Sequence, residues 1–155
     1  MKALTIWQPF ASLIMIGAKP FEFRTWDYRL RHPDVVDQRI VIHASVRPIR
    51  PPEVFEILQR IQRKDGTLRN DVAMPLLERL LSAHKCEGVL ELGAALGTAV
   101  IGRPRKFGGS FAIPAANKTV ESMWAWPLGD VKKWHEPVPM NGAQGFWNCQ
   151  IKVAA

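Results

Sequence analysis

Three charged side chains and one aromatic ring lie close together near the start of this sequence. Lys19, Glu22 and Arg24 occupy the segment G-A-K-P-F-E-F-R-T-W, which ends at Trp26. A carboxylate between an ammonium and a guanidinium can fix all three groups by hydrogen bonds, and an indole beside them can stack on a planar molecule. These side chains are therefore candidates for binding a flat, polar ligand. The alternative is an ordinary surface ion pair between Glu22 and Arg24.

A strand that begins at Phe21 is the element expected to position this cluster. Alternate side chains of a strand lie on opposite faces of the sheet. Phe21 and Phe23 would then form a core-like face, whereas Glu22, Arg24 and Trp26 would share the opposite face. The pattern predicts one buried apolar face and one face that carries the chemistry.

Motifs at both ends of the chain resemble the ASCH family, named for homology to activating signal cointegrator. The first part is Q-P-F-A-S-L at 8–13, with Phe10 where the family usually has Trp, followed by G-x-K-x-x-E-x-R at 17–24. The second is E-P-V-P-x-x-G-x-Q-G-x-W at 136–147. The resemblance is specific at these two ends and weak between about 48 and 85.

The resemblance implies an α+β fold: a PUA-like small β-barrel with helices packed on it and a helical insertion at about residues 50–85. The length of 155 residues fits a single domain, 1–155. Short apolar runs bounded by turn residues support a small sheet on pattern alone. Strands are expected at 3–7, 21–26, 38–43, 88–92, 97–102, 124–131 and 145–153.

Local signals predict a helix before the charged cluster and two more in the insertion. The first helix runs to about residue 16, with Pro9 in its first turn and Gly17 in the left-handed conformation that ends it. This ending aims Lys19 at the following strand. Asp71 is expected to cap the third helix, with Pro75 in the first turn. The two insertion helices are expected at 52–63 and 71–84.

The resemblance implies that the G-x-K-x-x-E-x-R residues line a pocket on one side of the barrel. Gln8 and Ser12 bracket the start of the first helix, where they can read a base edge or cap backbone groups. The family's second strand ends in a similar polar pair, so His43 and Ser45 can face the pocket, although a hydrogen-bonded barrel histidine is the alternative for His43. Stacking of a base is expected of Trp26, and Tyr28 is a further candidate.

The charge of the chain favours an anionic partner. The formal net charge is +7 and the isoelectric point is about 9.9. Together with the resemblance, this charge predicts that the protein binds RNA or a modified nucleotide through a basic pocket. Lys19 and Arg24 would contact phosphate or carbonyl oxygens, and Glu22 would accept from an exocyclic amine or orient Arg24. Trp26 would stack on the base.

Two other kinds of function stay open at this point. Some small bacterial ASCH proteins are amidohydrolases that act on N4-acetylcytidine, with the motif lysine as base and a threonine three residues later as nucleophile. Glu22 occupies that threonine position here, so acyl transfer to a hydroxyl is impossible at this place. Lys19 and Glu22 are the candidate catalytic residues of a hydrolase that uses water instead, or of a ribonuclease. A protein-interaction module is the remaining alternative.

No metal or cofactor is expected. The sequence contains no zinc-deaminase signature, no H-E-x-x-H and no phosphate-binding Walker loop, and its four histidines have no ligand-like spacing. Cys86 and Cys149 are expected to be buried, reduced thiols. No apolar run is long enough to span a membrane, and the N-terminus has no leader-like pattern. We therefore expect a cytoplasmic protein without membrane contact, and a monomer.

Overall fold

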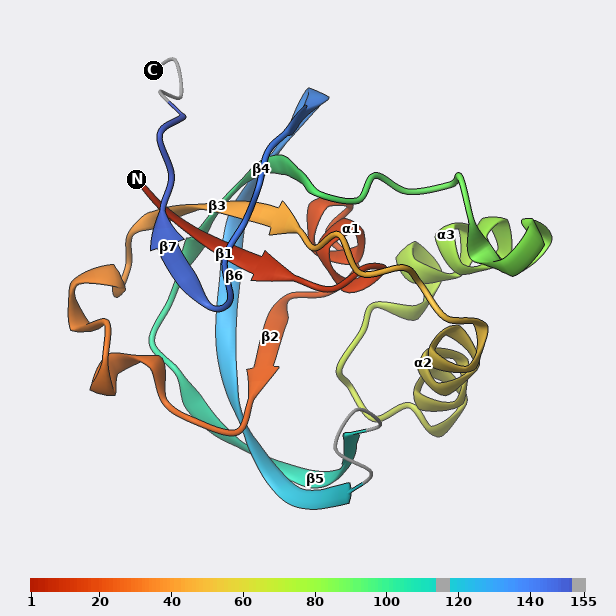
Figure 1. The fold of residues 1–155 in the computed structure, drawn as a ribbon. Helices are drawn as coiled ribbons and strands as arrows, with labels where there is room; N and C mark the ends of the chain where they lie inside the picture. The colour runs from red at the N-terminus through yellow and green to blue at the C-terminus, as the bar shows by residue number, and fades with distance from the viewer. Residues whose placement is uncertain (114–117, 152–155) are drawn as a thin grey trace.

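Aliphatic and β-branched residues build the centre of the sheet, because such side chains favour a pleated, buried surface. The computed structural model of this chain describes residues 1–113 and 118–151, and Figure 1 shows their arrangement. Over these ranges the fold is α+β, with a seven-stranded mixed sheet and three α-helices. The strands are β1 (Lys2–Ile6), β2 (Phe21–Arg24), β3 (Arg39–Ala44), β4 (Ala94–Ile101), β5 (Arg105–Ile113), β6 (Lys118–Pro139) and β7 (Phe146–Asn148). The helices are α1 (Phe10–Met15), α2 (Pro51–Arg63) and α3 (Asn70–Ser82).

The long strand β6 connects the two halves of the sheet. The strand order is β2-β6-β4-β3-β1-β7, and β5 also pairs with β6. Among the paired strands, β1 and β3 run parallel, with Thr5 opposite His43, and the other pairs are antiparallel. Backbone pairing between the described strands does not close this sheet into a barrel.

The two faces of β1 and β3 cover different apolar clusters. Leu4 and Ile42 face the main core, which also contains the fully buried Trp126. Ala3 and Val41 lie on the opposite face and pack beneath the C-terminal segment. Because side chains alternate along each strand, both faces of these central strands are buried.

The helical region packs on α1 rather than on the centre of the sheet. Leu13 of α1 belongs to the same buried cluster as Val54 of α2 and Leu77 of α3. The backbone N–H of Arg69, just before α3, donates to the carbonyl oxygen of Ala18 at 2.8 Å. Figure 1 shows α2 and α3 together at one side of the molecule, beyond α1. Of the helices that the structure describes, none is long and apolar enough to cross a membrane.

The expected strand at 88–92 is wrong. Residues 87–93 are irregular, with positive φ angles at Gly88 (74°) and Gly93 (62°), and β4 begins only at Ala94. Val89 and Leu90 pack against the helical cluster, so their apolar side chains are buried without strand pairing. Conversely, β5 is not among the expected strands, and its first residue, Arg105, pairs with Ala125 of β6.

Several boundaries also differ from expectation. Pro9 precedes α1 as its N-cap, and α3 begins at Asn70 after Arg69, so Asp71 lies in the first turn and does not cap the helix. Pro75 is an internal residue of α3. Strand β6 is longer than the strand expected at 124–131, and β7 is shorter than the strand expected at 145–153. The last two residues of that expected strand, 152 and 153, lie outside the described ranges.

Candidate functional site

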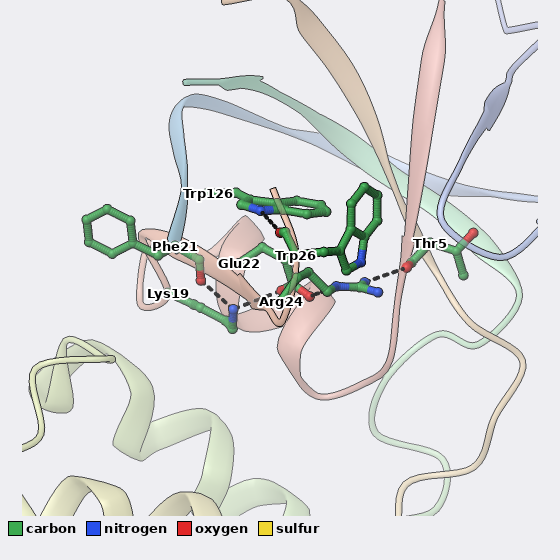
Figure 2. A network of polar contacts seen from close by, with 7 residues as sticks. All are labelled: Thr5, Lys19, Phe21, Glu22, Arg24, Trp26 and Trp126. Carbon is green, nitrogen blue, oxygen red and sulfur yellow. Dashed lines mark hydrogen bonds and ion pairs between the residues drawn. The ribbon is translucent and has the colours of Figure 1, made fainter. Parts of the chain in front are cut away.

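Glu22 bridges the two basic residues of the charged cluster. The Nζ atom of Lys19 donates to Oε2 of Glu22 at 2.9 Å, and Nε of Arg24 donates to Oε1 at 2.8 Å. Figure 2 shows the three side chains meeting beside β2. Lys19 is 6% exposed and Glu22 7%, so this arrangement is a buried network and not a surface ion pair.

The end of α1 delivers Lys19 to this network. Gly17 adopts a left-handed conformation with φ of 80°, and its N–H donates to the carbonyl oxygen of Ile14 at 3.0 Å. The N–H of Ala18 donates to Leu13 at 2.9 Å, which completes a Schellman ending. The predicted glycine stop is confirmed, and it turns the chain from the helix into β2.

The ammonium of Lys19 lies in an aromatic environment. It donates a second hydrogen bond to the carbonyl oxygen of Phe21. The ring centroids of Phe10 and Phe23 are 5.6 and 5.3 Å from Nζ. Both contacts are within cation–π range, so the rings compensate part of the lost hydration of the ammonium.

Arg24 connects β2 to β1 across the edge of the sheet. Its Nη2 atom donates to the carbonyl oxygen of Thr5 at 3.4 Å, and its guanidinium carbon lies 5.8 Å from the ring centroid of Trp126. The side chain of Arg24 is 29% exposed. Of the three charged groups, the guanidinium of Arg24 is therefore the one that solvent reaches most.

The faces of β2 differ from the predicted assignment. The alternation itself is confirmed, since the rings of Phe21 and Phe23 lie together with centroids 6.1 Å apart. However, both Phe residues are only partly buried, whereas Glu22 is buried opposite the fully buried Trp126. The charged face thus points toward the core, because paired and hydrogen-bonded charges can be buried.

Trp26 lies beyond the strand on which it was expected, because β2 ends at Arg24. Its indole is partly buried and packs edge-on against Trp126, with centroids 5.1 Å apart. The guanidinium carbon of Arg31 lies 5.3 Å from the centroid of the same ring. Trp26 therefore packs against Trp126, the ring that lies next to the guanidinium of Arg24 (Figure 2).

Burial and charge act in opposite directions on the two buried groups. Burial lowers the pKa of Lys19 below its usual range, and the attraction of Glu22 only partly offsets this. Burial alone would raise the pKa of Glu22, but the positive charges and hydrogen bonds of Lys19 and Arg24 lower it overall. Glu22 is consequently held as a carboxylate.

Gln8 and Ser12 make their hydrogen bonds within the protein. Gln8 is fully buried; its Nε2 donates to Ser12 Oγ at 2.8 Å and to the carbonyl oxygen of Glu91 at 2.9 Å. Its Oε1 accepts from the backbone N–H of Ser12 at 2.9 Å. The structure therefore shows the capping role of Gln8 and not an open base-reading edge. Ser45 is partly buried after β3 and accepts from the N–H of Arg47 at 3.1 Å.

His43 belongs to a separate buried network. Its Nε2 lies 3.0 Å from the carbonyl oxygen of Met140, which can only accept, so Nε2 carries the proton. Nδ1 then accepts from the hydroxyl of Thr5 at 3.2 Å, and that hydroxyl accepts from Trp147 Nε1 at 2.9 Å. Tyr28 is also fully buried and donates to the carbonyl oxygen of Gly102 at 2.8 Å. Both side chains are structural in this arrangement.

Four participants in the site were not identified from the sequence. Phe10 and Trp126 surround the cations, and the carbonyl oxygen of Thr5 accepts from Arg24. Arg60 of α2 adds a positive charge that lowers the pKa of Lys19. Figure 2 shows the helical region on the side toward which Lys19 points. No spacing rule links residues so far apart in the chain, so only the folded structure reveals them.

Two surface cavities lie elsewhere on the described part of the chain, and neither is lined by Lys19, Glu22 or Arg24. One has a volume of about 450 Å³ beside α3 and the other about 360 Å³ beside the N-terminus. Across residues 1–113 and 118–151, no group of three or more His, Cys, Asp or Glu side chains is placed to hold a metal ion. Because Arg24 is the most exposed of the three charged side chains, a ligand at the charged cluster would approach through its guanidinium.

The sequence was compared with known protein families and with curated proteins. No family model matches the chain. No curated protein matches it either. A functional proposal therefore depends on the geometry of the site and on the motif resemblance.

Proposed function

We propose that this chain is an ASCH-type, PUA-like domain that binds RNA or a modified nucleotide at the Lys19–Glu22–Arg24 cluster. The observation that carries the proposal is the position of Glu22, whose two carboxylate oxygens accept from two different cations. A buried acid that orients two basic groups is an arrangement suited to recognising phosphate or carbonyl oxygens.

The two ends of the sheet are linked by side-chain contacts, which supports a barrel-like architecture. Arg24 of β2, the first strand in the order, reaches Thr5 of β1, the neighbour of the last strand. Inside, Trp126 of β6 and Phe146 of β7 are stacked with ring centroids 5.7 Å apart. Side chains thus bridge the gap that backbone pairing leaves open, as expected for the interior of a small barrel.

Each charged residue has a distinct role in this proposal. Among the described residues, Nη1 of Arg24 has no hydrogen-bond partner, so this nitrogen contacts the phosphate or a carbonyl oxygen of the ligand. Glu22 orients Arg24, since both of its oxygens are already engaged. Lys19 supplies a buried positive charge, and Trp26 offers an aromatic ring for stacking.

Tryptophan fluorescence during titration with nucleosides and short single-stranded RNAs tests this proposal. Replacement Arg24→Gln removes one charge from the site and is expected to weaken binding about tenfold or more, within the range for a charged hydrogen bond. Arg79→Gln, which removes the same charge from the exposed face of α3, should bind like the wild type. Equal affinities of the wild type and Arg24→Gln would contradict the proposal.

One observation favours a hydrolase as the second candidate. The lowered pKa of Lys19 is a property that a general base requires. Release of cytidine from N4-acetylcytidine, and of shortened fragments from RNA, would be compared for the wild type, Lys19→Ala and Glu22→Gln. Turnover that is the same in all three proteins would exclude these residues as catalytic groups.

A further inference from the structure

An exposed tryptophan lies at the end of β1, outside the charged cluster. Trp7 is 41% exposed, and the guanidinium carbon of Arg47 lies 3.8 Å from its ring centroid. The backbone of Trp7 is anchored, because its carbonyl oxygen accepts from the N–H of Ala11 at 3.2 Å. One part of the indole is thus covered by a planar cation, and another part is open to solvent.

The covering guanidinium is itself held in place. Arg47 donates from Nη1 and Nη2 to the two carboxylate oxygens of Glu53 at 2.9 and 2.7 Å. This bidentate pair fixes the plane of the guanidinium and neutralises its charge. Trp7 and Arg47 therefore form a rigid, flat stack. This stack offers a ligand an aromatic surface, because the positive charge of Arg47 is already paired with Glu53.

The surroundings of this stack favour a nucleic-acid strand. Val46 and Leu92, which are 70% and 40% exposed, add exposed apolar side chains in two segments near the end of β1. Their segments are joined to the end of β1 by hydrogen bonds from Ser45 N to the carbonyl of Ile6 and from Gly93 N to that of Ser45. At the start of α2, Arg50 is exposed and has no ion-pair partner among the described residues. An aromatic platform beside an unpaired arginine is typical of single-strand binding surfaces.

The stack also lies close to the charged cluster along β1. Arg24 contacts the carbonyl oxygen of Thr5, and Trp7 follows two residues later, roughly 7 Å away for extended backbone. Figure 1 shows β1 and β3 ending on the same side of the molecule, next to α1. The two features therefore meet near the end of β1, within the reach of neighbouring nucleotides.

We propose that the exposed face of Trp7, backed by Arg47, stacks a second nucleobase next to the nucleotide at the charged cluster. The proposal rests on the proposed function and makes it more specific. The ligand is a single-stranded segment of at least two nucleotides and not an isolated nucleoside. Stacking on an indole is tolerant of sequence, so this second position adds affinity without selecting a base.

Binding of a trinucleotide and of the corresponding mononucleotide to Trp7 variants tests this inference. In Trp7→Ala, affinity for the trinucleotide should fall about tenfold, while affinity for the mononucleotide stays unchanged. Trp7→Phe should retain most of the affinity because it keeps an aromatic face. Leu81→Ala is the control, since it removes an exposed apolar side chain from α3, outside the proposed binding surface, and should leave both affinities unchanged.

Four results would overturn the inference. One is unchanged trinucleotide affinity in Trp7→Ala; if Arg24→Gln weakens binding in the same experiment, the proposed function survives and only the second position is lost. Another is an equal loss for both ligands, which would place the effect of Trp7 at the first nucleotide. In the third, Trp7→Ala leaves trinucleotide affinity unchanged but abolishes a self-association that sedimentation detects in the wild type. That result would assign the surface to a second copy of the chain. A wild-type protein that binds neither ligand would remove the proposed function as well.

Discussion

Glu22 carries a full negative charge at a position where only 7% of the residue is exposed. Such a charge is tolerated only because each oxygen accepts from a cation, at 2.9 Å from Lys19 and 2.8 Å from Arg24. The reverse also holds, since Lys19 is equally buried and depends on Glu22 as its only ionic partner among the described residues. The cluster is therefore a mutual arrangement in which no member can be removed without cost.

Replacement Glu22→Gln should destabilise the fold because it leaves the buried ammonium of Lys19 without a counter-charge. We expect the free energy of unfolding to fall by about 3–5 kcal/mol. Urea denaturation followed by circular dichroism measures this change. The control Glu136→Gln alters an exposed carboxylate of β6 and should stay within about 0.5 kcal/mol of the wild type. Similar values for both variants would argue against a buried network.

The pH dependence of stability follows from the lowered pKa of Glu22. In the unfolded chain this carboxyl titrates near its ordinary value of 4.5, whereas in the folded protein it stays ionised to lower pH. Its contribution to stability is therefore complete above pH 4.5 and is lost as the pH falls through the folded-state pKa. The difference in unfolding free energy between wild type and Glu22→Gln should narrow below pH 4.5. A difference that stays constant down to pH 3 would contradict this prediction.

At the scale of elements, the ending of α1 decides where Lys19 lies. A left-handed Gly17 allows the N–H groups of both Ala18 and Lys19 to donate to the carbonyl oxygen of Leu13. The chain then enters β2 after a turn of only a few residues. The spacing of the G-x-K-x-x-E-x-R motif is in this way the length needed to pass from a helix end to a strand.

Gly17→Ala should lower the free energy of unfolding by about 1 kcal/mol, because a Cβ disfavours left-handed backbone. No atom lies within 4 Å of the added methyl group, so the cost is conformational and not a clash. Gly129→Ala is a matched control, since it is equally open but lacks a positive φ. Thermal denaturation of the two variants measures the contrast. If Gly129→Ala were the more destabilising of the two, the conformational argument would fail.

Comparison of the expected and observed elements shows which sequence signals were sufficient to predict a helix or a strand. The helices are local and periodic, and both insertion helices were expected within about two residues of their bounds, Pro51–Arg63 and Asn70–Ser82. The segment at 88–92 has strand-like composition but packs on the helical cluster, so tertiary burial replaces pairing. Strand β5 was missed because Arg105 and Lys106 look solvent-exposed in sequence, although their backbone pairs with β6. Strand pairing is non-local, and for that reason local patterns predict it less well.

At the scale of the whole molecule, the excess of basic residues should govern binding by release of counterions. The net charge of +7 predicts that RNA affinity falls as salt concentration rises, with a logarithmic slope of about −0.7 per phosphate contact for a single strand. Arg24→Gln should make this slope less steep by about 0.7, whereas Arg79→Gln should leave it unchanged. Fluorescence titrations at several salt concentrations provide the measurement. Affinity that is independent of salt would favour the protein-interaction alternative instead.

The sequence by itself determined the local features of this protein: the helix that ends at Gly17, the alternation of Phe21 and Phe23 with Glu22 and Arg24, and the basic charge. These depend on backbone preferences and on spacing over a few residues, which can be read without a fold. Only the tertiary structure decided that the charged face turns inward and that Gln8 braces the start of α1. It also placed the guanidinium of Arg24 against Thr5. These outcomes depend on contacts between residues that are distant in the chain. Whether a polar side chain is buried there depends on the partners that the whole fold brings to it.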